Sequence, residues 1–332
     1  MGALFVGVDG GGTSTRCVVV TESGEIAGRG RAGGANALSV PDPAANLRSA
    51  LLGALEGLEP ARVAGGVFGL AGAARAAEPA ERAWREAGLA GRPVVVADVL
   101  VAFAGATDEP DGAVLVAGTG AIGARIRDRR VVRRADGLGW LLGDEGSGVW
   151  LGRRAAAAAL NAIDGRGGPT VLVARVAEAV LGPGTAGEDD GPALARALVA
   201  AVYARVAESG PAWLGTLAPV VDAAAREGDE VARGVVAEAA RRLCRTARVV
   251  VGEGPRERRA QRGGGPLVLA GSLLTEPTEL AHLVRAELGR RAVLVRARDG
   301  AAGAAALAVR AAFPGDPRAA EAHRALIRQG GA

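Results

Sequence analysis

The sequence predicts an α/β protein made of two domains, and three observations support this. Strand-like apolar runs alternate with helix-like patterns along most of the 332 residues. A chain of this length can form two domains that each bury their own core. The same order of elements begins twice, each time with two strands joined by a glycine-rich turn. We therefore expect one domain over residues 1–110 and a second over 111–299, with 300–332 as a candidate to join the first.

The first half of the chain predicts three neighbouring strands, then alternating helices and strands. Strands are expected at 4–9, 14–21 and 25–32, joined by the glycine turn and by a hairpin turn at 22–25. These three strands should form a meander. After them we expect a helix at 44–58, a strand at 63–70, a helix at 79–88, a strand at 93–97 and a helix from Asp98. The order is βββαβαβα.

The second half begins the same series again after a loop-like joint at 106–113. Strands are expected at 113–117, 122–127 and 130–134, followed by helices from Ser147 and at 170–182, 192–208 and 216–251. The series then continues with a strand at 267–270, a helix at 276–289, a strand at 292–297 and a helix at 300–312. A loose helix is expected from Pro314 onward. The second half thus repeats the first with a helical insertion.

Composition excludes several classes of protein. Hydrophobic residues make up 49% and charged residues 23%, and no apolar run reaches the roughly 18 residues of a membrane helix. The first ten residues lack the basic segment of a signal peptide. Cys17 and Cys244 form no paired motif, so we expect reduced thiols in a cytoplasmic protein. Because His282 and His323 are the only histidines, histidine metal clusters and Ser-His-Asp catalysis are not favoured.

All 40 basic residues are arginine, since the sequence contains no lysine. A Walker A loop, a protein-kinase active site and a Schiff-base enzyme each need a lysine, so these chemistries are excluded. Any bound phosphate must be held by backbone amides, hydroxyls and a metal ion. The net charge of +4 and the 3% of aromatic residues do not favour nucleic acid, and the basic stretches 127–134 and 256–262 are interpreted as solvated turns.

The first glycine turn is the centre of the motif VGVDGGGTSTRCVVV. Gly10, Gly11 and Gly12 allow either a tight hairpin turn or a close approach of the bare main chain to phosphate. Thr13 would add a hydroxyl. Asp9 ends the first strand and cannot favourably contact phosphate without a cation, so we expect it to hold hydrated Mg²⁺.

The second glycine turn contains Gly118, Thr119 and Gly120. With Gly123 it satisfies the GxGxxG spacing of a dinucleotide site, but the next segment alternates as a strand and not as a helix. A dinucleotide fold is therefore not favoured. The two turns are instead expected to face each other across a cleft between the domains, with a nucleotide triphosphate between them and the Thr119 hydroxyl on a phosphate oxygen.

Three acidic residues allow both a structural and a functional interpretation. Asp98 ends the apolar strand PVVVAD and begins a helix, as an N-cap residue does, but it is also a candidate catalytic carboxylate. Asp144 and Glu145 precede the long helix from Ser147, where the helix macrodipole favours acidic residues whatever their function.

Five blocks, in order and spanning nearly the whole chain, resemble the BadF/BadG-type ATPase family and its N-acetylglucosamine kinase branch. They are GVDGGGTSTR, LVAGTGAIGARI, GLGWLLGDEGSGVWLGRRA, LVLAGSLL and RDGAAGAAALA. This family belongs to the sugar kinase, Hsp70 and actin superfamily. The resemblance implies two actin-like (ribonuclease H-like) domains, ATP with Mg²⁺ in the cleft between them, and an amino sugar phosphorylated at its 6-hydroxyl.

The resemblance also assigns roles to individual positions. It implies that Asp98 is the catalytic base and that Gly271 and Ser272 form the adenosine loop, although a strand-to-helix turn would look the same. The implied sugar-binding residues are Asn36, Asp98, Gly139, Trp140, Asp144 and Glu145. Asn36 could instead be a turn residue, and Leu38 stands where some relatives carry an aromatic residue. The segment 299–301 is interpreted as the structural start of the closing helix.

The sequence therefore predicts an ATP-dependent kinase for N-acetylglucosamine or a related hexosamine. The sugar itself stays open among glucosamine, N-acetylglucosamine, N-acetylmannosamine, muramic acid derivatives and glucose. An iron-sulfur ATPase is not favoured because Cys17 lies in an inner strand, and a sugar-responsive repressor would need a DNA-binding module before Val6. A non-kinase BadF/BadG-type ATPase is the remaining alternative. A chaperone-like ATPase would need a peptide-binding domain for which the chain is too short, and an actin-like one would assemble with nucleotide. The resemblance allows a homodimer, and neither nucleic acid nor a membrane is an expected partner.

Overall fold

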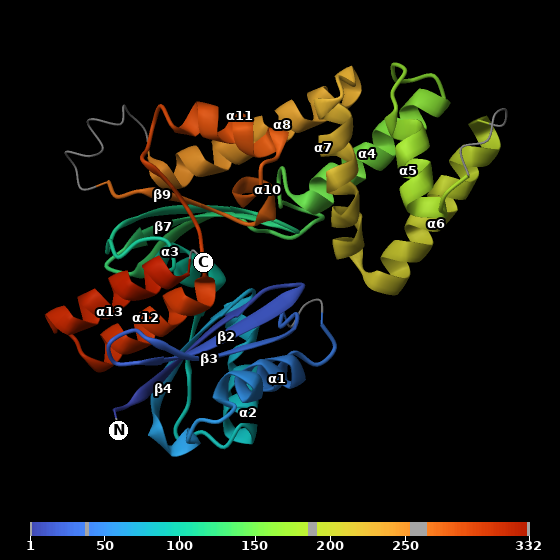
Figure 1. Ribbon diagram of the computed structural model, residues 1–332. Coiled ribbons are helices and arrows are strands. Elements are labelled where there is room, and N and C mark those ends of the chain that lie inside the picture. The colour runs from blue at the N-terminus through green and yellow to red at the C-terminus, as the bar shows by residue number, and fades with distance from the viewer. Residues whose placement is uncertain (1, 37–39, 185–190, 253–263, 331–332) are drawn as a thin grey trace.

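The first of two five-stranded mixed sheets is built by the N-terminal part of the chain (Figure 1). The computed structural model describes residues 2–36, 40–184, 191–252 and 264–330. The strands of the first sheet are β1 (Leu4–Gly10), β2 (Ser14–Thr21), β3 (Ile26–Gly33), β4 (Val63–Leu70) and β5 (Val94–Ala97). Their order is β3-β2-β1-β4-β5, in which the pairs β3–β2 and β2–β1 are antiparallel and the pairs β1–β4 and β4–β5 are parallel. The predicted meander of the first three strands is confirmed.

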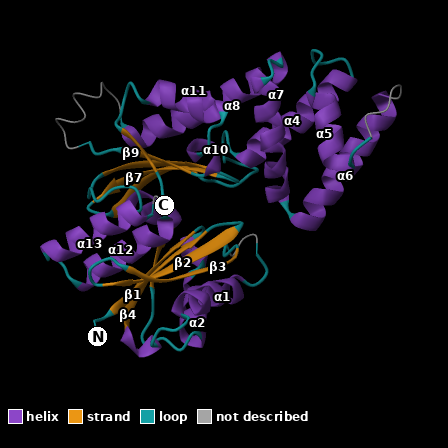
Figure 2. Cartoon of the chain, viewed as in Figure 1, coloured by secondary structure: helices purple, strands orange, loops and turns teal. Residues whose placement is uncertain are grey.

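The second sheet repeats this arrangement (Figure 2). Its strands are β6 (Gly112–Ala117), β7 (Ala121–Arg127), β8 (Arg130–Asp136), β9 (Leu267–Ala270) and β10 (Leu294–Arg296). The order β10-β9-β6-β7-β8, read from the opposite edge, matches that of the first sheet strand for strand. The basic stretch 127–134 is consequently mostly strand, with Asp128 and Arg129 as its turn.

Helices cover both sheets and build an insertion between β8 and β9. The first half contains α1 (Pro43–Leu55), α2 (Ala77–Glu86), α3 (Asp98–Ala104) and the short η1 (Pro60–Arg62) and η2 (Ala73–Arg75). The insertion contains α4 (Gly148–Ile163), α5 (Leu172–Leu181), α6 (Gly191–Ser209), η3 (Pro211–Leu217), α7 (Ala218–Arg226) and α8 (Glu230–Val251). The chain ends with α10 (Ser272–Thr275), α11 (Glu279–Leu288), α12 (Gly300–Ala312) and α13 (Pro317–Gln329). Within the described residues, no helix is both long and apolar enough to cross a bilayer.

The structure divides one predicted helix and shortens another. The stretch 216–251 breaks at Gly228, whose φ of 102° does not suit a helix, and Asp229 then caps α8 by accepting the Ala232 N–H. The stretch 276–289 begins as a turn, because Pro277 precedes Thr278 and the Thr278 side chain caps α11 by accepting the Ala281 N–H.

The two faces of the first sheet are covered by different parts of the chain. Alternate residues of β1 point to opposite faces, so Val6 and Val8 pack with α1 and α2, whereas Phe5 packs with α12 and α13. Figure 1 shows α1 and α2 on the outer side of this sheet. Cys17 is 1% exposed in the core shared with α1 and α2.

Helix α13 is more firmly packed than the loose helix that we expected from the sequence. Its residues Ala319, Ala322 and Leu326 are buried. The His323 ring is also buried, with Nε2 2.7 Å from the Ala104 carbonyl oxygen and Nδ1 accepting from Arg310. Burial lowers the pKa of His323 to about 4, so the ring is neutral near pH 7.

Helix α12 lies very close to the first sheet because both contribute small residues. A Cβ atom on Gly7 of β1 would lie 2.2 Å from the Ala301 carbonyl oxygen. A Cβ on Gly303 would likewise lie 2.2 Å from the Val101 carbonyl oxygen of α3. This close contact supports the proposal that 300–332 joins the first domain, 1–110, and that 111–299 forms the second.

Helix α3 lies between the two sheets (Figure 1). Its Val101 belongs to the core beneath α12, while Val99 and Phe103 pack with residues of β6, β7 and β9. On its far face the second sheet is covered by α8, which contacts β6 and β7, and α11 packs on α8. The helix that begins with Asp98 is therefore in contact with both halves of the molecule.

Candidate active site

The first group of predicted residues lies at one edge of the first sheet. Strands β1, β4 and β5 are parallel, and the pairing aligns Gly10 with Leu70 and Leu70 with Ala97. Asp9 and Asp98 therefore lie at the same carboxyl edge, one residue before and one residue after this row. In open α/β sheets, ligands bind outside this edge.

The first glycine turn presents its tip to solvent. Gly12 and Thr13 are exposed, whereas two carbonyl oxygens of the turn are engaged by neighbouring loops. The Gly10 oxygen accepts the Ala71 N–H at 3.0 Å, and the Gly11 oxygen accepts the Ala35 N–H at 2.9 Å. These contacts fix the orientation of the turn.

Asp9 lies directly before this turn and pairs with Arg16 across β1 and β2. The Arg16 guanidinium donates to Asp9 Oδ2 at 3.0 Å. Burial raises the pKa of Asp9 to about 6, with repulsion from Asp98 and Asp299 adding to the effect and Arg16 opposing it. The carboxylate is thus in an environment where an added cation would be favourable.

The residues near Asp9 suit a magnesium ion that keeps most of its water. No group of three or more His, Cys, Asp and Glu side chains able to hold a metal occurs among the described residues. Mg²⁺ typically takes one or two carboxylates and fills its other positions with water and substrate phosphate oxygens. A partly buried carboxylate, 20% exposed, beside an exposed glycine turn fits this pattern.

Asp98 is the first residue of α3, and its side chain is half-buried. Its Oδ1 accepts the Val99 N–H at 2.9 Å. Burial raises the pKa of the Asp98 carboxyl. This hydrogen bond and the positive charge of Arg134 on β8 lower it, but by less. A carboxylate with a raised pKa is a better proton acceptor than an exposed one, as a general base requires.

The second glycine turn is held by the start of α4. The Gly118 N–H donates to Gly120 oxygen at 2.9 Å, while the Gly118 oxygen accepts the Gly148 N–H at 2.8 Å. The Thr119 oxygen accepts the Val149 N–H at 3.2 Å, and Thr119 itself is exposed. As in the first turn, carbonyl oxygens are engaged from behind.

Four glycines from four segments come together beside this turn. A Cβ atom on Gly118 would lie 3.9 Å from Gly271 Cα, and one on Gly148 would lie 3.5 Å from Gly215 Cα and 3.1 Å from the Gly118 oxygen. Gly271 has a φ of 84°, and a Cβ there would lie 2.3 Å from the Ala117 oxygen. Ser272 begins α10 and is exposed. The predicted adenosine loop thus adjoins the second turn.

The loop 137–146 between β8 and α4 is organised by Asp136. Asp136 Oδ1 accepts the N–H groups of Gly137 at 2.8 Å and Asp144 at 2.7 Å, and its Oδ2 accepts the Glu145 N–H at 2.8 Å. One carboxylate therefore ties together the two ends of this loop. Gly139, with a φ of 83°, lies in the middle of it, and Trp140 is 38% exposed.

Asp144 and Glu145 point to different neighbours. Asp144 Oδ1 accepts the Ala121 N–H at 3.2 Å, so its carboxylate adjoins the second glycine turn. Burial raises the pKa of Asp144, with repulsion from Asp136 adding to it and the Ala121 hydrogen bond opposing it. Glu145 forms an ion pair with Arg242 of α8.

Asn36 lies near the first turn. Its side-chain oxygen is 3.5 Å from the position of a Cβ on Gly72, and its carbonyl oxygen accepts the Val40 N–H at 3.0 Å. Leu38, singled out in the sequence, lies outside the described residues. Asp299 caps α12 by accepting the N–H groups of Ala301 and Ala302, as the structural interpretation of 299–301 expected.

Sequence reasoning missed four residues of this region: Arg16, Arg134, Asp136 and Gly215. The alternation of β2 could have suggested Arg16, because it pairs with Asp9 once the hairpin register is known. Arg134 and Gly215 act on residues far away in the sequence, so no local pattern points to them. Asp136 resembled the polar end of a strand.

Comparison with known proteins identifies the family. The pattern of the BadF/BadG/BcrA/BcrD ATPase family matches residues 6–308. The chain belongs to this family. A curated relative, the N-acetylmuramic acid/N-acetylglucosamine kinase of Clostridium acetobutylicum, is 31% identical over 169 residues, which are 50% of this chain and 51% of the relative. This match thus spans about half the length of the curated relative.

Solved structures of similar fold cover almost the whole chain. A protein of Chromobacterium violaceum, described provisionally as an N-acetylglucosamine kinase, has a TM-score of 0.70 at 28% identity, covering 93% of this chain and 99% of that one. A glucokinase of the ROK family from Streptomyces griseus, solved with glucose and AMPPNP, has a TM-score of 0.55 at 21% identity, covering 92% and 99%. The fold of this member of the BadF/BadG/BcrA/BcrD family is thus the actin-like fold predicted from the sequence.

Proposed function

We propose that the protein is an ATP-dependent kinase that phosphorylates the 6-hydroxyl of an amino sugar, with N-acetylglucosamine as the preferred substrate. The main support is Asp98, whose carboxyl has a raised pKa and lies beside Asp9 at the carboxyl edge of the first sheet. The names of the Clostridium and Chromobacterium relatives support the choice of sugar.

The triphosphate of ATP is proposed to lie between the two glycine turns. Gly10, Gly11, Gly12 and Thr13 would contact it from one side, and Gly118, Thr119 and Gly120 from the other. In both turns carbonyl oxygens are engaged from behind, which favours the other face of the turn toward an anion. The Gly11 and Gly118 N–H groups donate to the Ser14 and Gly120 oxygens, so the phosphate contacts are proposed for the remaining N–H groups of the turns. Asp9 would hold magnesium through water, and the ion would neutralise charge on the phosphates.

The adenosine is proposed to lie against Gly271 and Ser272, with Gly215 and Gly148 completing a surface free of side chains. The four neighbouring glycines allow a flat ring system to approach the main chain. This assignment adds the insertion, through η3, to the nucleotide site.

The sugar is proposed to bind through Asn36, Asp98, Gly139, Trp140, Asp144 and Glu145. Asp98 would accept the proton of the 6-hydroxyl as its oxygen attacks the γ-phosphorus in line with the leaving ADP oxygen. Contact of Asp144 with sugar hydroxyls would compete with its hydrogen bond from Ala121. Glu145 would contact the sugar only at the expense of its ion pair with Arg242.

A substrate panel tests this function. ADP formation with Mg-ATP is measured for N-acetylglucosamine, glucosamine, N-acetylmannosamine, N-acetylmuramic acid and glucose, and the product is located by ³¹P–¹H NMR. We expect the highest kcat/KM for N-acetylglucosamine and phosphate on O6. ADP formation at the same rate with and without every sugar would contradict a kinase and support a non-kinase ATPase.

A further inference from the structure

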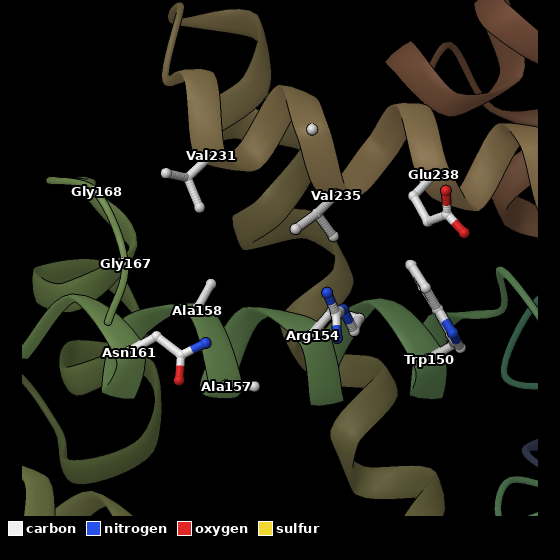
Figure 3. A pocket seen from close by; sticks show the side chains of 11 residues that line it. Trp150, Arg154, Ala157, Ala158, Asn161, Gly167, Gly168, Val231, Val235 and Glu238 are labelled. Carbon is white, nitrogen blue, oxygen red and sulfur yellow. The ribbon is translucent and has the colours of Figure 1, made fainter. Parts of the chain in front are cut away.

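A charged groove lies between α4 and α8, and of the residues proposed to bind ATP or sugar only Glu145 lines it (Figure 3). Two adjoining cavities of about 240 and 450 Å³ share four lining residues, so they form one continuous groove. The shared residues are Trp150, Arg154, Gly234 and Glu238. The larger cavity alone has the size of a small-molecule pocket, about 300–1,000 Å³.

The larger end of the groove carries an excess of positive charge. It is lined by four arginines and two glutamates: Arg153, Arg154, Arg241, Arg242, Glu145 and Glu238. Glu238 pairs with Arg241 and Arg242, and Glu145 pairs with Arg242. Across the described ranges of the chain, no carboxylate lies within 4.0 Å of Arg153 or Arg154. Two guanidinium charges are therefore left without an acidic partner.

Two of the four arginines, Arg154 and Arg242, pack on the ring of Trp150. The Arg242 guanidinium carbon lies 5.2 Å from the centre of the indole ring and that of Arg154 lies 5.8 Å from it. Trp150 is only 5% exposed, so the ring is a fixed support. Preorganised guanidinium groups favour phosphate, which they can bind through two parallel hydrogen bonds.

The smaller end of the groove is nearly neutral. Beyond Arg154 and Glu238 it is lined by Asn161, by Val231 and Val235 of α8, and by glycine and alanine residues. Figure 3 shows Asn161 at the opposite end of the row from Trp150. A ligand of matching shape has a charged group at one end and a neutral body at the other.

We propose that this groove binds a phosphorylated amino sugar, with its phosphate between Arg153, Arg154 and Arg242 and its ring toward Asn161. The four arginine and two glutamate charges sum to about +2, which matches a phosphomonoester dianion near neutral pH. The choice of an amino sugar as the neutral body rests on the proposed function, because that reaction produces such a molecule. The recognition of a phosphate by the arginines does not depend on the proposed function.

The groove adjoins the loop 137–146 through one ion pair. Arg242, at the groove, holds Glu145, whose N–H is bound by Asp136. A phosphate that contacts Arg242 competes with the Glu145 carboxylate. Occupancy of the groove is thereby linked to the part of the molecule that is proposed to contact the sugar.

Calorimetric titration of the whole protein tests the proposal. N-acetylglucosamine 6-phosphate and inorganic phosphate are titrated separately, with Mg-ADP and N-acetylglucosamine in excess to occupy the proposed catalytic site. We expect the sugar phosphate still to bind, and to bind at least tenfold more tightly than phosphate, with affinity falling as salt increases. The double variant Arg153→Ala/Arg154→Ala should weaken this binding at least tenfold.

The matched control removes two arginines elsewhere. Arg196→Ala/Arg205→Ala changes the same charge at exposed positions of α6 and should alter the affinity less than twofold. Asn161→Ala provides a second variant of the groove and should reduce the preference for the sugar phosphate over phosphate. Thermal melting checks that each variant folds.

Three results would overturn the proposal. They are no binding of the sugar phosphate with the catalytic site occupied, equal weakening in the groove and control variants, and equal affinity for inorganic phosphate, which would make the ligand free phosphate. Failure of the kinase assignment is recognised separately, because it appears as a lack of sugar-dependent ADP formation.

Discussion

The two sheets share one strand order but differ in the connection from the third strand to the fourth. In the first sheet, β3 and β4 are joined by 34–62, which contain α1 and η1. In the second sheet, β8 and β9 are joined by 137–266, which contain the loop held by Asp136, helices α4–α8 and the arginine groove. The same framework is thus used twice, and the longer second connection holds the loop and the groove that we propose to bind ligands.

The two glycine turns show the same difference at close range. The first turn is supported by Ala35 and Ala71, which belong to segments next to it in its own sheet. The second turn is supported by the first N–H groups of α4, which belong to the insertion. Changes in the insertion should therefore reach the second turn and leave the first unaffected.

The largest effect on activity is expected when Asp98 of the first half is changed, and Asp144 of the second half provides the comparison. We expect Asp98→Asn to lower kcat about 10²–10⁴-fold, because the amide cannot accept the proton of the sugar hydroxyl. Asp144→Asn should act chiefly on the KM for sugar. Steady-state kinetics measure both, and nucleotide titration checks that Asp98→Asn still binds ATP. Near-normal turnover of Asp98→Asn would remove this residue from the role of base.

Alanine in the two glycine segments should separate folding from binding. Gly271→Ala forces a side chain into a positive φ and against the Ala117 oxygen, so we expect a loss of at least about 2 kcal/mol in the free energy of unfolding. A Cβ on Gly11 meets no atom nearer than 3.8 Å. Gly11→Ala should therefore change stability by less than about 1 kcal/mol.

The same pair of variants tests the phosphate assignment. If the Gly11 main chain faces phosphate, Gly11→Ala should weaken ATP binding while urea unfolding stays nearly as in the unchanged protein. Unaltered ATP affinity in a folded Gly11→Ala variant would argue against the first turn as a phosphate site.

The buried charge of Asp9 should make the first half less stable as pH rises. The folded protein holds the Asp9 proton more tightly than the unfolded chain, with a pKa of about 6 against 3.8. Stability from this group is therefore lost between about pH 4 and pH 6. We expect Asp9→Asn to be more stable than the unchanged protein by about 1–3 kcal/mol at pH 8, and equally stable below pH 4.

Denaturant unfolding at several pH values measures this effect, and Arg16→Gln serves as the opposite control. That variant removes the attraction that opposes the burial of Asp9, so it should be less stable at pH 8. A pH-independent difference between Asp9→Asn and the unchanged protein would contradict the assignment. Asp9→Asn should also reduce turnover if Asp9 holds magnesium.

The smallest expected effect concerns Asp136, which ties the loop of the insertion. We expect Asp136→Ala to raise the KM for sugar about tenfold and to leave the KM for ATP nearly unchanged. The reason is that three N–H groups of the loop lose their shared acceptor, and a typical hydrogen bond contributes about 1 kcal/mol. Asp164→Ala is a suitable control, since Asp164 lies at the far end of α4 and pairs with Arg166. Equal KM values for sugar in both variants would show that the loop does not contribute to sugar binding.

Local patterns were sufficient to predict the strands. β2, β4 and β9 begin and end at the expected residues, because apolar alternation and flanking glycines mark them. The break at Gly228 was not predicted, since a single glycine within a long helical pattern often continues the helix.

The site could be predicted only in part, because its contacts cross the chain. Asp9, Asp98 and the two turns were visible as motifs next to strand ends. The contacts of Asp144 with Ala121 and of Glu145 with Arg242 depend on how a loop folds back, which no spacing reveals. The groove brings α4 beside α8, and neither helix carries a recognisable motif for it.

The contact between Gly7 and α12 has a consequence for the synthesis of the protein. β1 is translated before every other strand of the two sheets, but the helices that cover Phe5 and Val18 are translated only after β10. One side of the first sheet therefore stays uncovered until translation has passed β10. Chaperone binding during translation would be expected at this side, and premature termination near residue 299 should yield an aggregating product.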